Sequence, residues 1–74
     1  MTPIELAIES VGTQVELAAA ISVTPQAVSG WVNGKRPVPA ERCIAIEEAT
    51  GGNVTRYDLR PDVFGEAPAK ARAA

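Results

Sequence analysis

The chain has 74 residues, with seven Lys or Arg, nine Asp or Glu and no His, so its formal net charge is −2. This length allows one small domain, and 46% apolar with 22% charged residues is typical of a globular protein. A single cysteine, Cys43, without any His excludes an intrachain disulfide, a Cys/His zinc site and a His-based catalytic triad. We therefore predict a non-enzymatic protein without cofactor or metal. The acidic balance alone argues against nucleic acid, since DNA-binding domains tend to be basic.

No membrane or export signal is expected from the sequence. The longest apolar run covers residues 17–21, far short of the roughly 20 residues that a membrane-spanning helix needs. A secretory signal begins with a basic segment ahead of an apolar one, and the first five residues contain no basic segment. With one lone cysteine, this pattern predicts an intracellular, cytoplasmic protein.

The first residues predict a short helix with a defined start and end. Thr2 is a typical N-cap, Pro3 suits the first helical position, and Glu5 has the spacing that closes a capping box. Gly12 is a typical C-terminal stop. Between them an apolar stripe recurs at three- and four-residue spacing, formed by Ile4, Ala7, Ile8 and Val11.

Two further helices follow at close distance. Thr13 and Glu16 predict another capping box, and residues 22–23 break the helical pattern. Thr24 and Pro25 repeat the cap-and-proline signal, and residues 33–34 end the third helix. The apolar residues expected to face inward are Leu17, Ala18, Ile21, Ala27, Val28, Trp31 and Val32.

The C-terminal half predicts a fourth helix and a short fifth one. Residues 35–38 form a loop, because residues before proline avoid helical angles. Pro39 is expected to begin the fourth helix, which ends at residues 50–53, and a helical turn follows over 55–59 until Pro61 ends it. A strand hairpin within residues 51–64 is the alternative, since Val, Thr and Tyr also suit strands. We expect one all-α domain over residues 1–64 and a flexible tail over 65–74.

Three features that could carry chemistry are interpreted as structural. Trp31 lies on an inward face, so core packing is favoured over stacking on a base. Cys43 lies within an apolar helical pattern, where a lone cysteine is typically a small buried hydrophobe. Residues 47–48 are adjacent glutamates that do not face each other on a helix, so a solvated surface is expected there.

The informative stretch is residues 14–33, where two helices meet across a short turn in the pattern of a helix-turn-helix. The outward side of the second helix carries short or amide-bearing side chains and no acid. Gln and Asn can pair with adenine in the major groove, and Ser or Thr can bond to bases or phosphates. Lys35 and Arg36 follow directly and can reach phosphates. The predicted DNA-binding residues are Gln14, Thr24, Pro25, Gln26, Ser29, Gly30, Asn33, Lys35 and Arg36.

On these residues, together with the downstream blocks 34–52 and 54–62, the sequence resembles the small helix-turn-helix regulators of the phage Cro and repressor class. It is most similar to the YdaS-like subgroup, found in prophages and described as antitoxins or Cro-like regulators. The resemblance implies a compact lambda-repressor-like bundle of four to five helices that binds double-stranded operator DNA as a homodimer, with the helix over 24–33 in the major groove. Its C-terminal segment would help dimerisation, although some members of the class have strands there.

The chain departs from this pattern at two positions. Ser22 stands where the turn usually carries Gly, so Ser22 must accept a tight turn conformation. Gly30 replaces a longer polar residue, which costs roughly 1 kcal/mol of helix propensity and removes one base contact. The cluster expected at the dimer seam, or equally as a cap on the monomer core, is Tyr57, Leu59 and Phe64.

The distribution of charge along the sequence changes what the net charge of −2 implies about DNA binding. Residues 17–40 contain no acid and include Lys35 and Arg36, whereas the acids precede or follow this window. We therefore predict a transcriptional repressor with a mildly positive surface on an acidic body. The alternative is an antitoxin-type interaction module that binds a toxin, with weak or secondary DNA binding.

Overall fold

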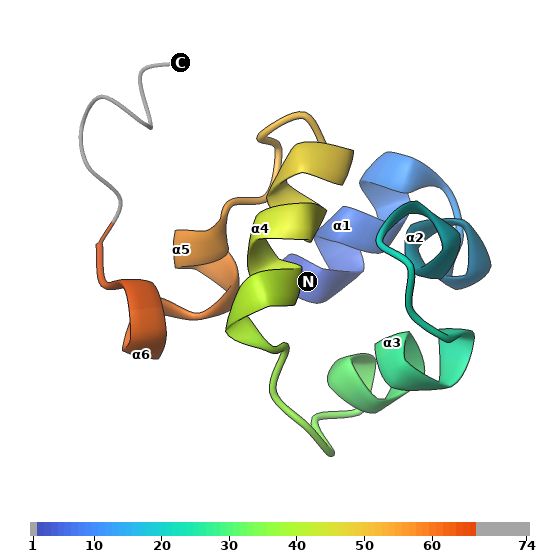
Figure 1. The fold of residues 1–74 in the computed structure, drawn as a ribbon, viewed down its shortest axis with the longest axis horizontal. Helices are drawn as coiled ribbons and strands as arrows, with labels where there is room; N and C mark the ends of the chain where they lie inside the picture. Colours follow the sequence, from blue (N-terminus) through green and yellow to red (C-terminus); the bar gives the residue numbers. More distant parts are fainter. Residues whose placement is uncertain (1, 67–74) are drawn as a thin grey trace.

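A computed structural model describes residues 2–66. This part of the chain is all-helical and has no strand (Figure 1). The expected all-α fold is confirmed, and the alternative hairpin within 51–64 is wrong. Part of the predicted tail, residues 67–74, lies outside the described residues. The helices are α1 (Pro3–Val11), α2 (Gln14–Ala20), α3 (Pro25–Val32), α4 (Ala40–Ala49), α5 (Arg56–Leu59) and α6 (Pro61–Phe64).

The helix starts follow the local signals in the sequence. Thr2 caps α1 in a complete capping box with Glu5. Thr13 caps α2 by accepting the Glu16 N–H at 3.1 Å. The predicted second box is only half formed, since the Glu16 carboxylate accepts from the Thr13 hydroxyl at 3.3 Å rather than from its backbone N–H. A third capping box, which joins Thr55 to Asp58, opens α5.

Helices α2, α3 and α4 end in the same way. In each, two N–H groups beyond the cap donate back to carbonyls of the last turn, the pattern of a Schellman motif, which needs a left-handed residue after the cap. Gly34 has φ +74° and Gly51 has φ +63° at this position in α3 and α4. In α2 the residue is Ser22, with φ +60°. The tight conformation expected of Ser22 is therefore confirmed.

The core lies between the helices and includes residues from the loops. Trp31 and Cys43 are buried, as predicted. Ile46 is the residue of α4 that the sequence analysis missed, and it is completely buried. The buried residues are Ile4, Ala7, Leu17, Ala18, Ile21, Val28, Trp31, Val38, Cys43, Ile46 and Val54. No helix among residues 2–66 has both the length and the apolarity to cross a membrane.

The C-terminal segment differs from the prediction in three details. Pro39 is the N-cap of α4 rather than its first residue, because its ψ of 146° is extended. The predicted helical turn does end before Pro61, since α5 stops at Leu59, but Pro61 also begins α6, a sixth helix beyond the expected four to five. Glu47 is not simply solvated, since its Oε1 accepts from the Arg56 backbone N–H at 2.8 Å and from Arg56 Nε at 3.1 Å. These bonds join α4 to α5.

Candidate nucleic-acid interface

Helices α2 and α3 pack directly on each other across the turn at residues 21–24. Ala18, the small residue expected where the two helices meet, is buried. Val28 and Trp31 bury the inner side of α3 in the core. This leaves the opposite side of α3 at the molecular surface, where Figure 1 shows the helix at the edge of the bundle, away from α5 and α6.

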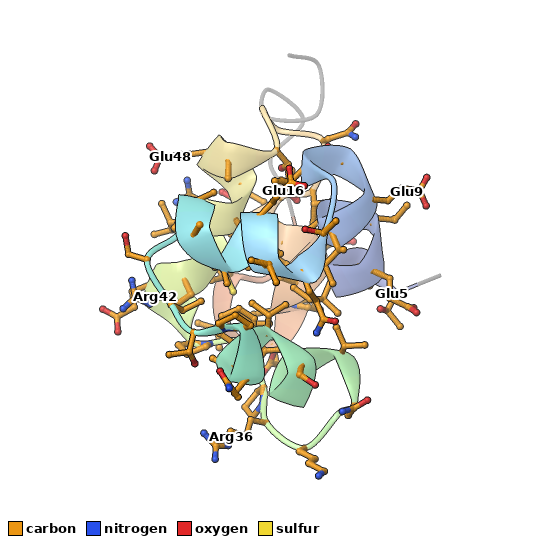
Figure 2. The ribbon with its side chains drawn as sticks, turned by 90° about the vertical axis from the view of Figure 1, so that its right-hand side faces the viewer. Glu5, Glu9, Glu16, Arg36, Arg42 and Glu48 are labelled. Carbon is orange, nitrogen blue, oxygen red and sulfur yellow. The ribbon has the colours of Figure 1, made fainter. Side chains whose placement is uncertain are left out.

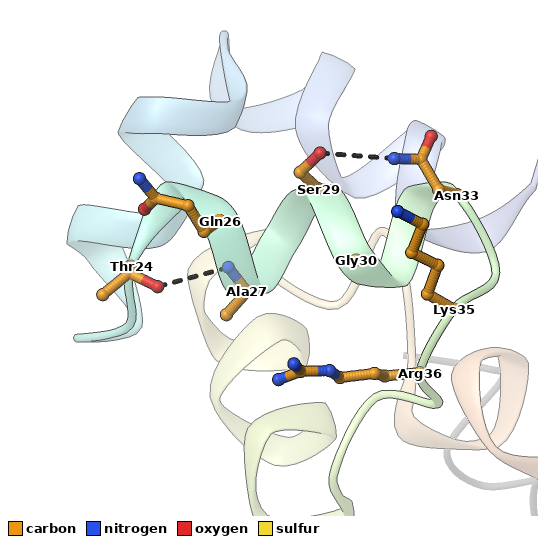
Figure 3. Close-up of a pocket in the computed structure, with 8 residues that line it drawn as sticks. All are labelled: Thr24, Gln26, Ala27, Ser29, Gly30, Asn33, Lys35 and Arg36. Carbon is orange, nitrogen blue, oxygen red and sulfur yellow. Dashed lines mark hydrogen bonds between the residues drawn. The ribbon is translucent and has the colours of Figure 1, made fainter.

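The outer side of α3 and the following loop enclose a shallow hollow of about 390 Å³. Figure 3 shows this hollow and the residues around it. Seven of the predicted DNA-binding residues meet here, and Ala27, which the sequence analysis placed in the core, is the addition. The lining consists of Thr24, Gln26, Ala27, Ser29, Gly30, Asn33, Lys35 and Arg36. No acidic side chain lines the hollow.

Hydrogen bonds already engage some of these polar groups. The Thr24 hydroxyl oxygen accepts the Ala27 N–H at 3.2 Å and so caps α3, which leaves the hydroxyl hydrogen as a donor. Asn33 Nδ2 donates to Ser29 Oγ at 3.4 Å (Figure 3), which orients both side chains on one surface. Gln26 is exposed. The hydroxyl and amide groups of the hollow therefore include both hydrogen-bond donors and acceptors, as contact with base edges requires.

Gly30 fixes the start of the loop that carries the two cations. Its carbonyl accepts the Lys35 N–H at 3.0 Å and the Arg36 N–H at 3.4 Å. A Cβ at Gly30 would meet Arg36 Cδ at 4.0 Å as its nearest neighbour, so the Arg36 side chain passes beside the glycine. Gly30, which stands where similar proteins carry a longer polar residue, thus lies where the loop folds back on α3.

The other predicted site residues lie outside the hollow. Gln14 is the half-buried first residue of α2, and Pro25 is the exposed first residue of α3. In the C-terminal cluster, Leu59 and Phe64 pack against the core, and the Tyr57 ring meets the Phe64 ring edge-on at 6.3 Å. This packing accounts for part of the cluster as a cap on the monomer core.

Charge is segregated over the molecule. Figure 2 shows Arg36 at the lower end, beyond α3, with Glu9, Glu16 and Glu48 around the upper half. Arg56 and Arg60 are held in ion pairs with acids of their own chain. Lys35 and Arg36, by contrast, are exposed. The surface around α3 is therefore the positive end of an acidic domain.

A curated protein, a solved structure and a family model are similar to this chain. A curated relative, described as "Putative transcriptional regulator YdaS" of Escherichia coli K12, is 49% identical over 53 residues, which cover 72% of this chain. The matched part spans 54% of that relative, so the chain corresponds to about half its length.

A solved structure confirms the fold. The Cro protein of a prophage element, Xfaso 1 of Xylella fastidiosa strain Ann-1, has a TM-score of 0.82 and 47% identity. The match covers 89% of this chain and all of that one. A family model described as "Bacterial toxin YdaS" matches residues 4–68, which is most of the sequence. The resemblance to Cro-type proteins is confirmed, and the chain belongs to the YdaS family.

Proposed function

We propose that the chain is a sequence-specific DNA-binding transcriptional regulator that represses by occupying operator DNA with α3 in the major groove. The observation that carries this proposal is the acid-free hollow on α3, with polar groups along the helix and two exposed cations at its end. The names of the relatives, a transcriptional regulator and a Cro protein, support the same function.

The proposed interface makes two kinds of contact with DNA, one to base edges and one to phosphates. Gln26, Ser29 and Thr24 would read base edges, because their amide and hydroxyl groups match the donor and acceptor pattern of the major groove. Lys35 and Arg36 would neutralise phosphates and so set the register without reading sequence. Gln14 and Asn33 would support this register from the first turn of α2 and the end of α3.

A homodimer would present two copies of α3 to half-sites about 34 Å apart, one turn of the duplex. The C-terminal cluster of Tyr57, Leu59 and Phe64 is the proposed seam. Each side chain in it is only half-buried within one chain, so apolar surface is left for a partner to cover. Sedimentation of a Tyr57→Ala variant, with and without DNA, tests this role, because loss of a seam would shift the complex towards a monomer.

Fluorescence anisotropy with DNA from upstream of the protein's own operon tests the function. Gln26→Ala should relax the preference at one base position, whereas Lys35→Ala should weaken binding to every sequence and lower the salt slope by about one. Glu9→Gln, a change on the acidic half of the surface (Figure 2), is the control and should keep base preference. A folded protein that shows no sequence preference at low salt would refute the proposal.

The second candidate function is an interaction module that binds a protein partner such as a toxin. Two large apolar side chains outside the α3 hollow favour it, since Leu6 is 46% exposed and Val15 is 62% exposed. Removing both Lys35 and Arg36 separates the two functions. A doubly substituted variant that still captures the product of a neighbouring gene would favour this candidate, whereas loss of capture along with DNA binding would count against it.

A further inference from the structure

Arg60, between α5 and α6, joins the C-terminal segment to the loop that carries Lys35 and Arg36. Its Nη1 donates to the Val38 carbonyl at 2.8 Å, across 22 positions of sequence. Its Nε and Nη2 donate to the two carboxylate oxygens of Asp62, at 3.0 and 2.8 Å. This paired geometry fixes the plane of the guanidinium, so that the third bond to Val38 has a defined direction.

The Val38 bond completes the attachment of the loop. At its start, the Lys35 and Arg36 N–H groups are tied to the Gly30 carbonyl. At its end, the buried Val38 side chain packs in the core while its carbonyl is held by Arg60. The short segment between these two attachments includes Arg36, and Pro37 restricts its backbone further.

A second hollow, of about 360 Å³, runs beneath this segment. Its lining includes Trp31, Arg36, Val38, Arg60 and Asp62. Residues of the loop and the paired side chains of Arg60 and Asp62 therefore border the same hollow. At its far end the loop is held by the buried Val38 side chain and by the Val38 carbonyl, which accepts from Arg60 Nη1 at 2.8 Å and from Cys43 Sγ at 3.9 Å.

We propose that Arg60 is a positioning residue for DNA binding, which holds the loop so that Lys35 and Arg36 meet the phosphates, with Asp62 orienting it. This inference rests on the proposed function. Arg60 itself is not a phosphate contact, because its side chain is only 20% exposed and three of its donors are already used.

The direction in which Kd for DNA changes when one acidic side chain is removed gives the sharpest test. Asp62→Ala and Glu48→Ala each remove one negative charge, so simple electrostatics predicts tighter DNA binding for both. Asp62 lines the hollow shared with Arg36, and the electrostatic gain should be larger there. We call the bond from Arg60 to the Val38 carbonyl the brace. If Asp62 orients the brace, Asp62→Ala should instead raise Kd about threefold to tenfold, as expected when the competent loop conformation falls to roughly 10–30% of the population.

Arg60 variants separate positioning from direct contact. A lysine at this position would keep the charge but cannot make the bidentate pair and the third bond together, so Arg60→Lys should weaken binding while the salt dependence of Kd stays as in wild type. A phosphate contact would behave otherwise: Arg60→Lys would keep its affinity, and Arg60→Gln would lower the salt slope by about one. Retained affinity in Arg60→Lys, or tighter binding in Asp62→Ala than in Glu48→Ala, would overturn the inference.

A measurement without DNA keeps this test independent of the proposed function. Hydrogen exchange at the Lys35 and Arg36 amides should be faster in Asp62→Ala than in wild type and unchanged in Glu48→Ala. Asp62 is 65% exposed, so its replacement should leave the fold intact, which far-UV circular dichroism checks. If wild type binds no DNA but exchange is faster in Asp62→Ala, the proposed function is wrong and the role of Arg60 in holding the loop is supported. Unchanged exchange in Asp62→Ala would show that Arg60 does not hold the loop in this way.

Discussion

Replacing Ser22 by glycine is expected to stabilise the protein. Ser22 has φ +60° and is the non-glycine residue with positive φ among residues 2–66. The Schellman bonds around it, from the Ser22 N–H to the Ala19 carbonyl at 3.3 Å and from the Val23 N–H to the Ala18 carbonyl at 2.9 Å, use backbone groups alone. Glycine keeps both bonds and lacks the Cβ that makes the left-handed region costly.

The magnitude follows from two opposing contributions. A residue with a Cβ pays roughly 1–2 kcal/mol in the left-handed region, whereas the greater freedom of glycine in the unfolded chain costs about 0.5–1 kcal/mol. The difference favours Ser22→Gly by about 0.5–1 kcal/mol of unfolding free energy. For a chain of this size that corresponds to a rise in Tm of about 2–8 °C.

Thermal and urea unfolding, followed by Trp31 fluorescence and circular dichroism at one protein concentration, measure this difference. Concentration must be fixed because dimerisation would shift the apparent Tm. Ser22→Ala keeps the strain and should lie within about 0.5 kcal/mol of wild type. Ser22→Val should be less stable than Ser22→Ala, because branching at Cβ is poorly tolerated at positive φ. A Ser22→Gly variant less stable than wild type would refute the assignment of strain to this turn.

Four further substitutions test other parts of the fold. Gly30→Ala should stabilise by up to about 1 kcal/mol, since a helical Cβ there is unobstructed, while Gly34→Ala should destabilise because Gly34 has φ +74°; urea unfolding of the pair compares them. The Arg56 bonds lower the pKa of Glu47 below its ordinary 4.5, so their stabilisation is present above about pH 4.5 and lost as pH falls through the folded value. Glu47→Gln should accordingly lower stability at pH 7 and flatten its decline on acidification, and an unchanged decline would contradict this. Ile46→Ala should cost about 2–5 kcal/mol by opening a cavity in the core, and a loss under 1 kcal/mol in calorimetry would show that the core collapses around it.

Local signals explain why so much of the fold could be predicted from the sequence. Thr2 with Pro3, and Thr24 with Pro25, cap their helices through bonds within three residues, so the pattern alone locates those starts. Helix α6 was not predicted, because Pro61 was given only the role of ending the preceding helix, whereas proline also suits the first position of the next one. Here both roles apply, since α5 ends at Leu59 and α6 begins at Pro61.

Contacts between distant parts of the chain could not be predicted in this way. Glu47 meets Arg56 nine positions away, and this bond depends on how α4 packs on α5. The outward residues of α3 follow from helical periodicity, and the hollow confirms that they share one surface. The Arg60 bond to Val38 spans 22 positions and follows no periodicity, so only the folded structure shows it.

Three of the four arginines in the described part of this acidic chain are engaged in bonds within the fold. Five of its seven Lys and Arg residues lie in the described part of the chain. Arg56 and Arg60 are paired with acids, and Arg42 is half-buried with Nη1 donating to the Ile21 carbonyl at 3.4 Å. For the proposed regulator, each subunit would then neutralise only about 2–4 phosphates, and its non-specific affinity for DNA would be low. Specific binding must consequently depend on base contacts and dimerisation more than in a basic repressor, which makes the geometry of the loop carrying Lys35 and Arg36 correspondingly important.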